Sequence, residues 1–149
     1  MIKKKLNRNA KKVDKFINKF LKRQTKSLLV SPMKYGVLSG GKKIRSTIIF
    51  DTGKLFKIKN KKLINICAAV ECIHSYSLIH DDLPCMDDDV TRRGKPSTHI
   101  KFGEATAVLA GNSLLTLAFE IIVDKSSLLN PKQKNDIVKL LANCSGHTG

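Results

Sequence analysis

The side chains most able to take part in chemistry are the acidic residues clustered between positions 81 and 89. This run of five carboxylates is followed closely by two arginines, Arg92 and Arg93. Carboxylate oxygens suit Mg²⁺, which proteins commonly hold through one or two carboxylates together with substrate phosphates. Arginine donates paired hydrogen bonds to phosphate oxygens. The run therefore predicts a site for magnesium and a diphosphate, and the alternative is a set of surface ion pairs of little energetic value.

The segment before this run predicts how the acids are positioned. Residues 62–83 are apolar on nearly every side, which indicates a helix at the centre of a bundle. On a helix turning about 100° per residue, His74 and Asp81 lie about 20° apart and so share one stripe. Pro84 ends the helix, which allows the loop to return Asp87 towards Asp81. Because a core helix that ends in paired acids is costly, the arrangement favours a site over a surface cluster.

A second candidate anion-binding segment reads Gly-Gly-Lys-Lys-Ile-Arg and occupies residues 40–45. Its glycines allow close approach to the backbone, and Lys42 and Arg45 lie three residues apart, so a phosphate could be gripped there. The segment is not a P-loop, because both the glycine spacing and the residue after the lysine are wrong. A plain helix start is the alternative interpretation.

Apolar spacing predicts the remaining elements of the chain. Besides residues 62–83, the predicted helices cover residues 6–21, 44–55 and 104–123 and a last segment that starts with Asn130 as N-cap and Pro131 as first helical residue. We expect Ser31-Pro32 to break the first helix, and a polar loop to run from Pro84 to Phe102. No alternation typical of strands is present. These patterns predict an all-α fold of about five to six helices in a single domain, residues 1–149.

The formal net charge of +16 is distributed unevenly along the chain. Residues 1–62 hold 20 basic and 2 acidic residues, whereas residues 63–149 hold 8 and 10. Lysine supplies 23 of the 28 basic residues, and lysine lacks the planar fork used for bidentate contacts to bases and phosphates. We therefore expect a solvated lysine-rich face and no nucleic-acid partner; a nucleic-acid-binding protein is the less favoured alternative.

The cysteines and the hydropathy of the sequence indicate the cellular compartment of the chain. The four cysteines show no C-x-x-C pair and no histidine at zinc-ligand spacing, which predicts reduced and mostly buried thiols. The basic N-terminus is not followed by the apolar run of a secretory signal. The apolar stretch 105–123 is interrupted by Gly111, Asn112 and Glu120, which favours a buried core helix over a membrane span. We expect a cytoplasmic chain.

Four segments together resemble the trans-prenyltransferases. They are the 40–45 segment, the run from Glu71 to Asp89, the sequence Arg-Arg-Gly-Lys-Pro at 92–96, and residues 99–105, which read His-Ile-Lys-Phe-Gly-Glu-Ala. The resemblance covers essentially the whole chain but only the N-terminal half of the family's usual length. It implies a partial isoprenoid-synthase helical bundle that joins isopentenyl diphosphate head to tail with an allylic diphosphate, dimethylallyl or geranyl. The implied product is farnesyl diphosphate, with geranylgeranyl diphosphate as the alternative.

The resemblance gives a role to each residue that matches the acidic run. Asp81, Asp82 and Asp87 match the first aspartate-rich motif in its D-D-x-x-x-x-D form and would bind Mg²⁺ that bridges the allylic diphosphate. Arg92 would contact the same diphosphate, and these four are the implied catalytic residues. Arg93 would contact the diphosphate of isopentenyl diphosphate.

The resemblance also implies a pocket for isopentenyl diphosphate that is completed by Lys42, Arg45 and His74. Tyr76, five residues before Asp81, is similar to the residue that limits the product to fifteen carbons. The intact enzyme is implied to be a homodimer.

The sequence departs from the family pattern after residue 102. The family's second aspartate-rich motif, which binds a further Mg²⁺, is missing, because the later acids are never paired. Ser46 stands where the family usually has proline, a change we expect to be tolerated. We expect the chain to be inactive alone and to need a complementing C-terminal half, with the apolar face of residues 105–123 uncovered. A non-catalytic remnant that binds Mg²⁺ and diphosphate is the alternative.

Overall fold

The computed structural model describes residues 2–24, 27–147 and 149. Within these residues the chain forms seven helices and one short hairpin, which confirms the all-α fold class. The helices are α1 (Ile2–Leu21), α2 (Val30–Val37), α3 (Ile44–Leu55), α4 (Asn60–Asp81), α5 (Thr98–Phe102), α6 (Glu104–Val123) and α7 (Pro131–Ser145), and the strands are β1 (Thr91–Arg92) and β2 (Lys95–Pro96).

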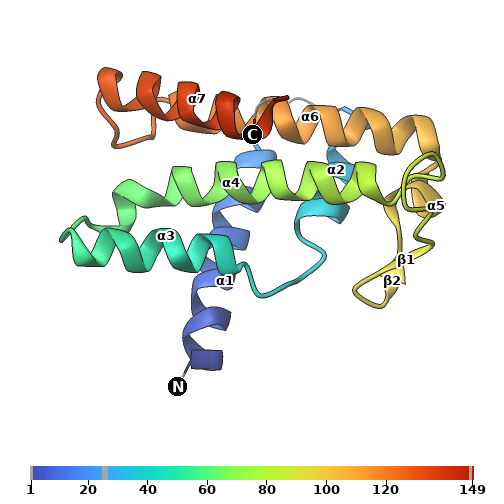
Figure 1. Ribbon diagram of the computed structural model, residues 1–149, viewed down its shortest axis with the longest axis horizontal. Helices are drawn as coiled ribbons and strands as arrows, with labels where there is room; N and C mark the ends of the chain where they lie inside the picture. Colours follow the sequence, from blue (N-terminus) through green and yellow to red (C-terminus); the bar gives the residue numbers. More distant parts are fainter. Residues whose placement is uncertain (1, 25–26, 148) are drawn as a thin grey trace.

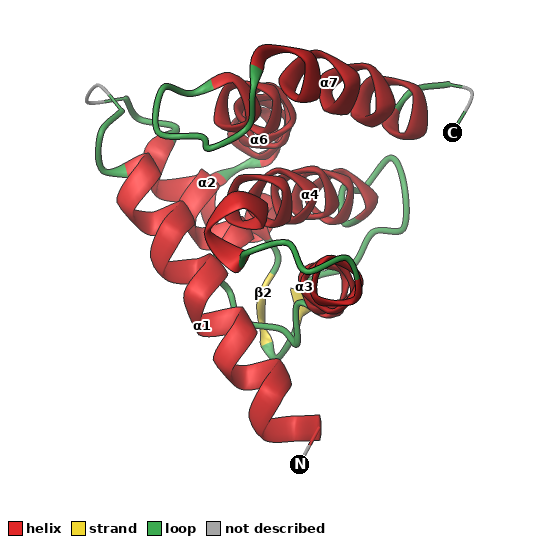
Figure 2. Ribbon diagram, turned by 90° about the vertical axis from the view of Figure 1, so that its left-hand side faces the viewer, coloured by secondary structure: helices red, strands yellow, loops and turns green. Residues whose placement is uncertain are grey.

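Helix α4 lies at the centre of the bundle, as the sequence predicts. It runs between α3 and α6, and α1 crosses this layer on one side (Figures 1 and 2). Helix α4 also contacts α1 and α2, whereas α7 rests on α6 at the outside of the bundle. The residue at the C-terminal end of the central helix is Asp81, so the core of the bundle leads directly into the acidic run.

Small side chains allow α4 and α6 to pack closely. Helix α4 buries Ala68, Ala69 and Cys72, and α6 buries three alanines, Ala107, Ala110 and Ala118. A Cβ on Gly111 would lie 2.3 Å from Nε2 of His80, so glycine at this position of α6 makes room for the His80 ring. The His80 ring therefore lies against α6, where its Nε2 is 3.1 Å from the Val108 carbonyl, next to the end of α4 that carries Asp81.

Helices α4 and α6 are both long and apolar enough to cross a membrane by length and composition. In the structure they pack against each other, and 50% and 44% of their apolar windows are buried inside the protein. This packing supports the interpretation of residues 104–123 as a core helix. Val108 and Leu109 on the same helix remain exposed, in agreement with an apolar face that nothing in the described residues covers. The cytoplasmic location stays a prediction.

Several predicted helix boundaries are confirmed. Helix α3 covers the predicted residues 44–55, and α6 covers 104–123. Helix α7 begins with a capping box, in which Oδ1 of Asn130 accepts from the Gln133 amide at 2.8 Å and Oε1 of Gln133 accepts from the Asn130 amide at 3.2 Å. Such reciprocal bonds satisfy amide groups that a helix start leaves unpaired.

Two predictions about local structure are wrong. Ser31-Pro32 does not break the first helix; that helix ends at Leu21, and the pair lies in the first turn of α2, where proline's fixed φ is compatible with a helix. The expected polar loop up to Phe102 contains the hairpin and α5. Strands of two residues are too short to show alternation in a sequence.

The cysteines divide into two pairs. Cys67 and Cys72 are buried, and burial raises the pKa of each thiol to about 12. Cys85 and Cys144 are exposed, so the prediction of mostly buried thiols is correct for only half of them. All four thiols are free in the structure, and the reduced state stays a prediction.

Candidate functional site

The loop after α4 folds back on the end of the helix. The amide of Asp87 donates to the backbone carbonyl of Asp81 at 2.8 Å, and the amides of Met86 and Asp88 donate to the carbonyl of Leu83 at 2.9 and 3.1 Å. Asp81 is half-buried and Asp87 is exposed. The loop therefore returns Asp87 to Asp81, as expected from a helix that stops before Pro84.

Asp82 is the buried acid of the run, with 2% of its surface exposed. Its Oδ1 accepts from Nε of Arg92 at 2.5 Å and also forms an ion pair with a terminal nitrogen of the same guanidinium. Asp89 binds Arg92 as well, at 3.2 Å. The hydrogen bond that Arg92 donates to Asp82 raises the pKa of Arg92; partial burial lowers it, and the charges of Asp82, Asp89 and Asp81 raise it further. Asp82 thus holds Arg92 in place, and its predicted role as a metal ligand stays a prediction.

In the described part of the chain, no ion pair engages Asp81 or Asp87, the two other carboxylates of the predicted metal motif. Among the residues that the structure describes, no group of three His, Cys, Asp or Glu side chains is arranged to enclose a metal ion. Asp81 and Asp87, whose backbones the folded loop joins, still suit Mg²⁺, because this ion is usually held by one or two carboxylates and completes its shell with water and phosphate oxygens.

The β1–β2 hairpin presents Arg93. Arg92 pairs with Lys95, and the two residues between them, Arg93 and Gly94, both have positive φ, of 54° and 73°. Positive φ at both positions is typical of a two-residue turn that matches strand twist, and glycine favours it. The hydroxyl of Tyr35 on α2 donates to the carbonyl of Pro96 at 2.7 Å and ties the hairpin to the bundle.

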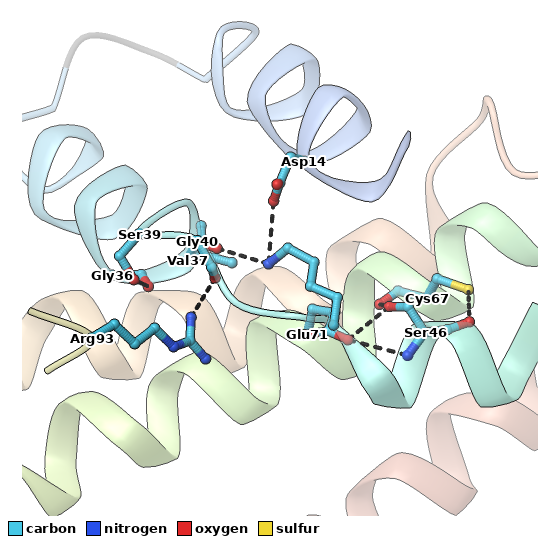
Figure 3. Close-up of polar contacts among 10 residues, drawn as sticks. Asp14, Gly36, Val37, Ser39, Gly40, Ser46, Cys67, Glu71 and Arg93 are labelled. Carbon is cyan, nitrogen blue, oxygen red and sulfur yellow. Dashed lines mark hydrogen bonds and ion pairs between the residues drawn. The ribbon is translucent and has the colours of Figure 1, made fainter. Parts of the chain in front are cut away.

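Arg93 joins the acidic run to the second candidate segment. Its guanidinium donates to the backbone carbonyl of Gly40 (Figure 3). A Cβ on Gly41 would lie 2.7 Å from the guanidinium carbon, so glycine at this position makes room for the arginine. Sequence reasoning assigned these glycines to ligand approach and missed this contact, because it joins residues more than fifty positions apart.

Lys43, next to the predicted Lys42, has a structural role. Its Nζ is buried, donates to the carbonyl of Val37 at 3.0 Å and pairs with Oδ1 of Asp14 at 3.2 Å. Lys42 is exposed in the turn after Gly41. The turn is therefore anchored from beneath by Lys43 and leaves Lys42 facing solvent.

Three further predicted residues line one surface pocket. Arg45 from α3 and His74 and Tyr76 from α4 meet there, beside the C-terminal end of α7. Partial burial, and next the positive charge of Arg45, lower the pKa of His74, while the carboxylate of Glu71 acts in the opposite direction. The lowered pKa favours the neutral form of His74, which can exchange a hydrogen bond with a ligand beside the Arg45 charge.

A match to the polyprenyl synthetase family covers residues 26–149. The chain belongs to this family. Farnesyl diphosphate synthase of Escherichia coli (strain K12) is 48% identical over 122 residues, which cover 81% of this chain and 41% of that protein. The farnesyl diphosphate synthase of Haemophilus influenzae is 44% identical over 139 residues, which cover 89% and 47%. The chain spans about half the length of the curated relatives it matches.

Solved structures agree with this polyprenyl synthetase assignment. A geranyltransferase from Legionella pneumophila superposes with a TM-score of 0.93 at 38% identity, over 100% of this chain and 53% of that one. An FPP/GFPP synthase from Zymomonas mobilis superposes with a TM-score of 0.93 at 37% identity, over 99% and 54%. The predicted partial isoprenoid-synthase bundle is thereby confirmed.

Proposed function

We propose that this polyprenyl synthetase chain carries the first diphosphate-binding half of a farnesyl diphosphate synthase. The reaction joins isopentenyl diphosphate to dimethylallyl or geranyl diphosphate. One observation carries the proposal, which is that both arginines lie beside the acidic loop that returns Asp87 to Asp81. Arg92 donates to the carboxylate of Asp82, and Arg93 donates to the carbonyl of Gly40 in the glycine segment. The farnesyl diphosphate synthases among its relatives support the choice of substrates.

The residues at the end of α4 suit departure of a diphosphate. Asp81 and Asp87 would hold Mg²⁺, which when bound neutralises charge on the allylic diphosphate. Arg92 donates hydrogen bonds to the diphosphate oxygens as negative charge develops there, and Asp82 keeps its guanidinium oriented for this. The exposed apolar side chains of α6, Val108 and Leu109, would contact the allylic chain and help to exclude water from it.

Isopentenyl diphosphate is assigned to the groups around the 40–45 turn. Arg93, Lys42 and Arg45 supply positive charge, and neutral His74 supplies a hydrogen bond. None of these side chains is a carboxylate, so we expect this half of the site to bind its diphosphate without Mg²⁺. Tyr76 lies one turn before His80 with the rings 5.1 Å apart, edge to face, and its position below the acidic run suits a limit on product length.

Calorimetry on the full chain tests the proposal. We expect geranyl diphosphate to bind only with Mg²⁺, and Asp81→Asn and Asp87→Asn to weaken this binding by at least about tenfold, as loss of one charge-assisted contact predicts. Asp136→Asn, on the exposed face of α7, is the matched control and should leave binding unchanged. Folded protein that binds geranyl diphosphate equally well without Mg²⁺ would refute the assignment.

Turnover of labelled isopentenyl diphosphate in the same samples separates the two candidate functions. Product formation that depends on Mg²⁺ would mean that the chain is a catalyst by itself. Mg²⁺-dependent binding without product would favour the diphosphate-binding module, in line with a chain that spans about half of its relatives' length. The homodimer implied by the family resemblance also stays a prediction, which light scattering of the purified chain tests.

A further inference from the structure

His80 is a half-buried residue in the last turn of α4, directly before Asp81. Its Nε2 lies 3.1 Å from the carbonyl oxygen of Val108 on α6. A carbonyl oxygen can only accept a hydrogen bond, so Nε2 carries a proton and donates it. This bond holds the imidazole against the neighbouring helix. His80 has no part in the function proposed above, so its fixed position needs another explanation.

Gly111 on α6 provides the space that the imidazole occupies. A Cβ at this position would lie 2.3 Å from Nε2, 2.5 Å from Cδ2 and 3.2 Å from Cε1 of His80. Gly111 lies in the middle of α6 and its φ is not positive, so the backbone does not require glycine there. Glycine also destabilises a helix interior relative to alanine. Room for the His80 ring is therefore the physical reason for glycine at position 111.

Tyr76 is the third residue of this contact. It lies one turn before His80 on α4, and the two rings meet edge to face, with their centroids 5.1 Å apart and their planes at 85°. Aromatic pairs favour this geometry. Tyr76 also lines the pocket between α4 and α7, together with Leu141 and Cys144. The ring that Tyr76 contacts is thus itself fixed on a different helix, α6.

A side chain that limits the length of a bound apolar chain has to keep one orientation. A tyrosine ring can rotate about χ1 to another staggered position, and packing against a fixed neighbour removes that freedom. We propose that His80 is a positioning residue for Tyr76, which it holds in the orientation that limits the length of the allylic chain. This inference rests on the function proposed above and on the predicted role of Tyr76, and it assigns His80 no contact with the ligand.

Two substitutions remove this support in different ways. His80→Ala deletes the ring, whereas Gly111→Ala keeps both rings in the chain and places a methyl group where the imidazole lies. Gly53→Ala in α3 is the matched control, because its Cβ would lie 2.1 Å from Cδ1 of Leu63, an equally close contact with a side chain. Leu63 lies thirteen residues before Tyr76 on α4, and so about 20 Å away along the helix.

NMR of the full chain with labelled tyrosine reports on the orientation of the Tyr76 ring. The chain has two tyrosines, so the spectrum holds two sets of ring signals, which Tyr35→Phe assigns. The position of these signals depends on the neighbouring His80 ring, whose centroid is 5.1 Å away. Gly111→Ala is the informative variant, because it retains both rings. We expect it to shift the Tyr76 signals, and Gly53→Ala to leave them unchanged.

Calorimetry with Mg²⁺ compares geranyl diphosphate with the longer geranylgeranyl diphosphate. We expect His80→Ala and Gly111→Ala to raise the affinity for the longer ligand relative to the shorter one by about two- to tenfold, as loss of an aromatic pair predicts. In the Tyr76→Ala background, His80→Ala should change this ratio no further, because His80 acts through the Tyr76 ring. Gly53→Ala should leave the ratio unchanged.

The outcomes separate this inference from the proposed function. A purely structural role predicts that both ligands lose affinity together while their ratio stays constant, and that result overturns the inference. An equal effect of His80→Ala on the ratio with and without the Tyr76 ring overturns it as well, because His80 would then act on the ligand directly. Folded wild-type protein that does not bind geranyl diphosphate overturns the proposed function, and the inference falls with it. Binding whose ratio is insensitive to Tyr76→Ala overturns the inference alone.

Discussion

Substitution of the two adjacent glycines in the 40–45 segment distinguishes the effect of backbone strain on stability from the effect of displacing Arg93 on ligand binding. Gly40 and Gly41 both have positive φ, of 94° and 104°, where an L-residue is strained. A Cβ at Gly40 would meet nothing within 4 Å, whereas a Cβ at Gly41 would lie 2.7 Å from the guanidinium carbon of Arg93. Gly40→Ala is therefore a matched control for Gly41→Ala.

The magnitudes follow from these contacts. Each substitution forces an unfavourable φ at a cost of about 1–3 kcal/mol, which lowers Tm by about 2–4 °C for each kcal/mol in a chain of this size. Only Gly41→Ala also displaces Arg93, the flexible partner, from the Gly40 carbonyl. Loss of a charge-assisted contact costs about 1.5–3 kcal/mol. That loss corresponds to a decrease of about ten- to a hundredfold in affinity for isopentenyl diphosphate.

Calorimetric titration and thermal unfolding of both variants test this prediction. We expect similar decreases in Tm for Gly40→Ala and Gly41→Ala, and a large loss of isopentenyl diphosphate affinity in Gly41→Ala alone. Equal affinities in the two variants would show that Arg93 takes no part in binding from this position, and would refute the reasoning.

Three further predictions concern other parts of the chain. At pH 8 a thiol reagent should label two cysteines in the folded protein and four after denaturation, because burial raises the pKa of Cys67 and Cys72 to about 12; rapid labelling of either one in the folded state would contradict this. Asn130→Ala should lower stability by about 0.5–2 kcal/mol through loss of the α7 cap, measured by urea unfolding, whereas Asn135→Ala on the exposed side of the same helix should have little effect. In any sample that forms product, we expect the Tyr76→Ala variant to make products longer than fifteen carbons, as measured by chromatography. An unchanged product length would show that Tyr76 does not limit the length of the product.

The thiols also give a pH dependence with a definite sign. In the unfolded chain Cys67 and Cys72 ionise near the ordinary thiol value of 9.0, whereas in the folded chain they keep their protons to about pH 12. The unfolded state therefore binds fewer protons between these values, so the free energy of unfolding falls as pH rises above 9.

The sequence was sufficient to predict the parts of the fold that depend on long periodic segments. Helix α6 and the centre of α4 are apolar over many turns, and the Asn130 cap of α7 is a local signal. Helix α2 and the hairpin were missed because each is short and is held by partners far along the chain, such as Tyr35 bonding to Pro96. Periodicity carries no information about such contacts.

The contacts of the candidate site were also only partly predictable from the sequence. Asp81 and Asp87 were expected to approach each other, because Pro84 has to end the helix, and the folded loop shows this. The pairing of Asp82 with Arg92 and the contact of Glu71 with Ser46 were not predicted. Glu71 sits inside an apolar helix, and only the packed neighbour shows which amide its carboxylate caps.

The ion pair between Lys43 and Asp14 has a consequence for how the N-terminal helix can evolve. The lysines on the outer face of α1 are exposed, and their number can drift with the composition of a genome at little cost to the fold. Asp14 is different, because it faces the buried ammonium of Lys43 beneath the turn that holds Gly40 and Gly41. Loss of that acid would leave a buried cation without its partner. Mutation should therefore be tolerated around most of α1's solvent face, while Asp14 and Lys43 change only together.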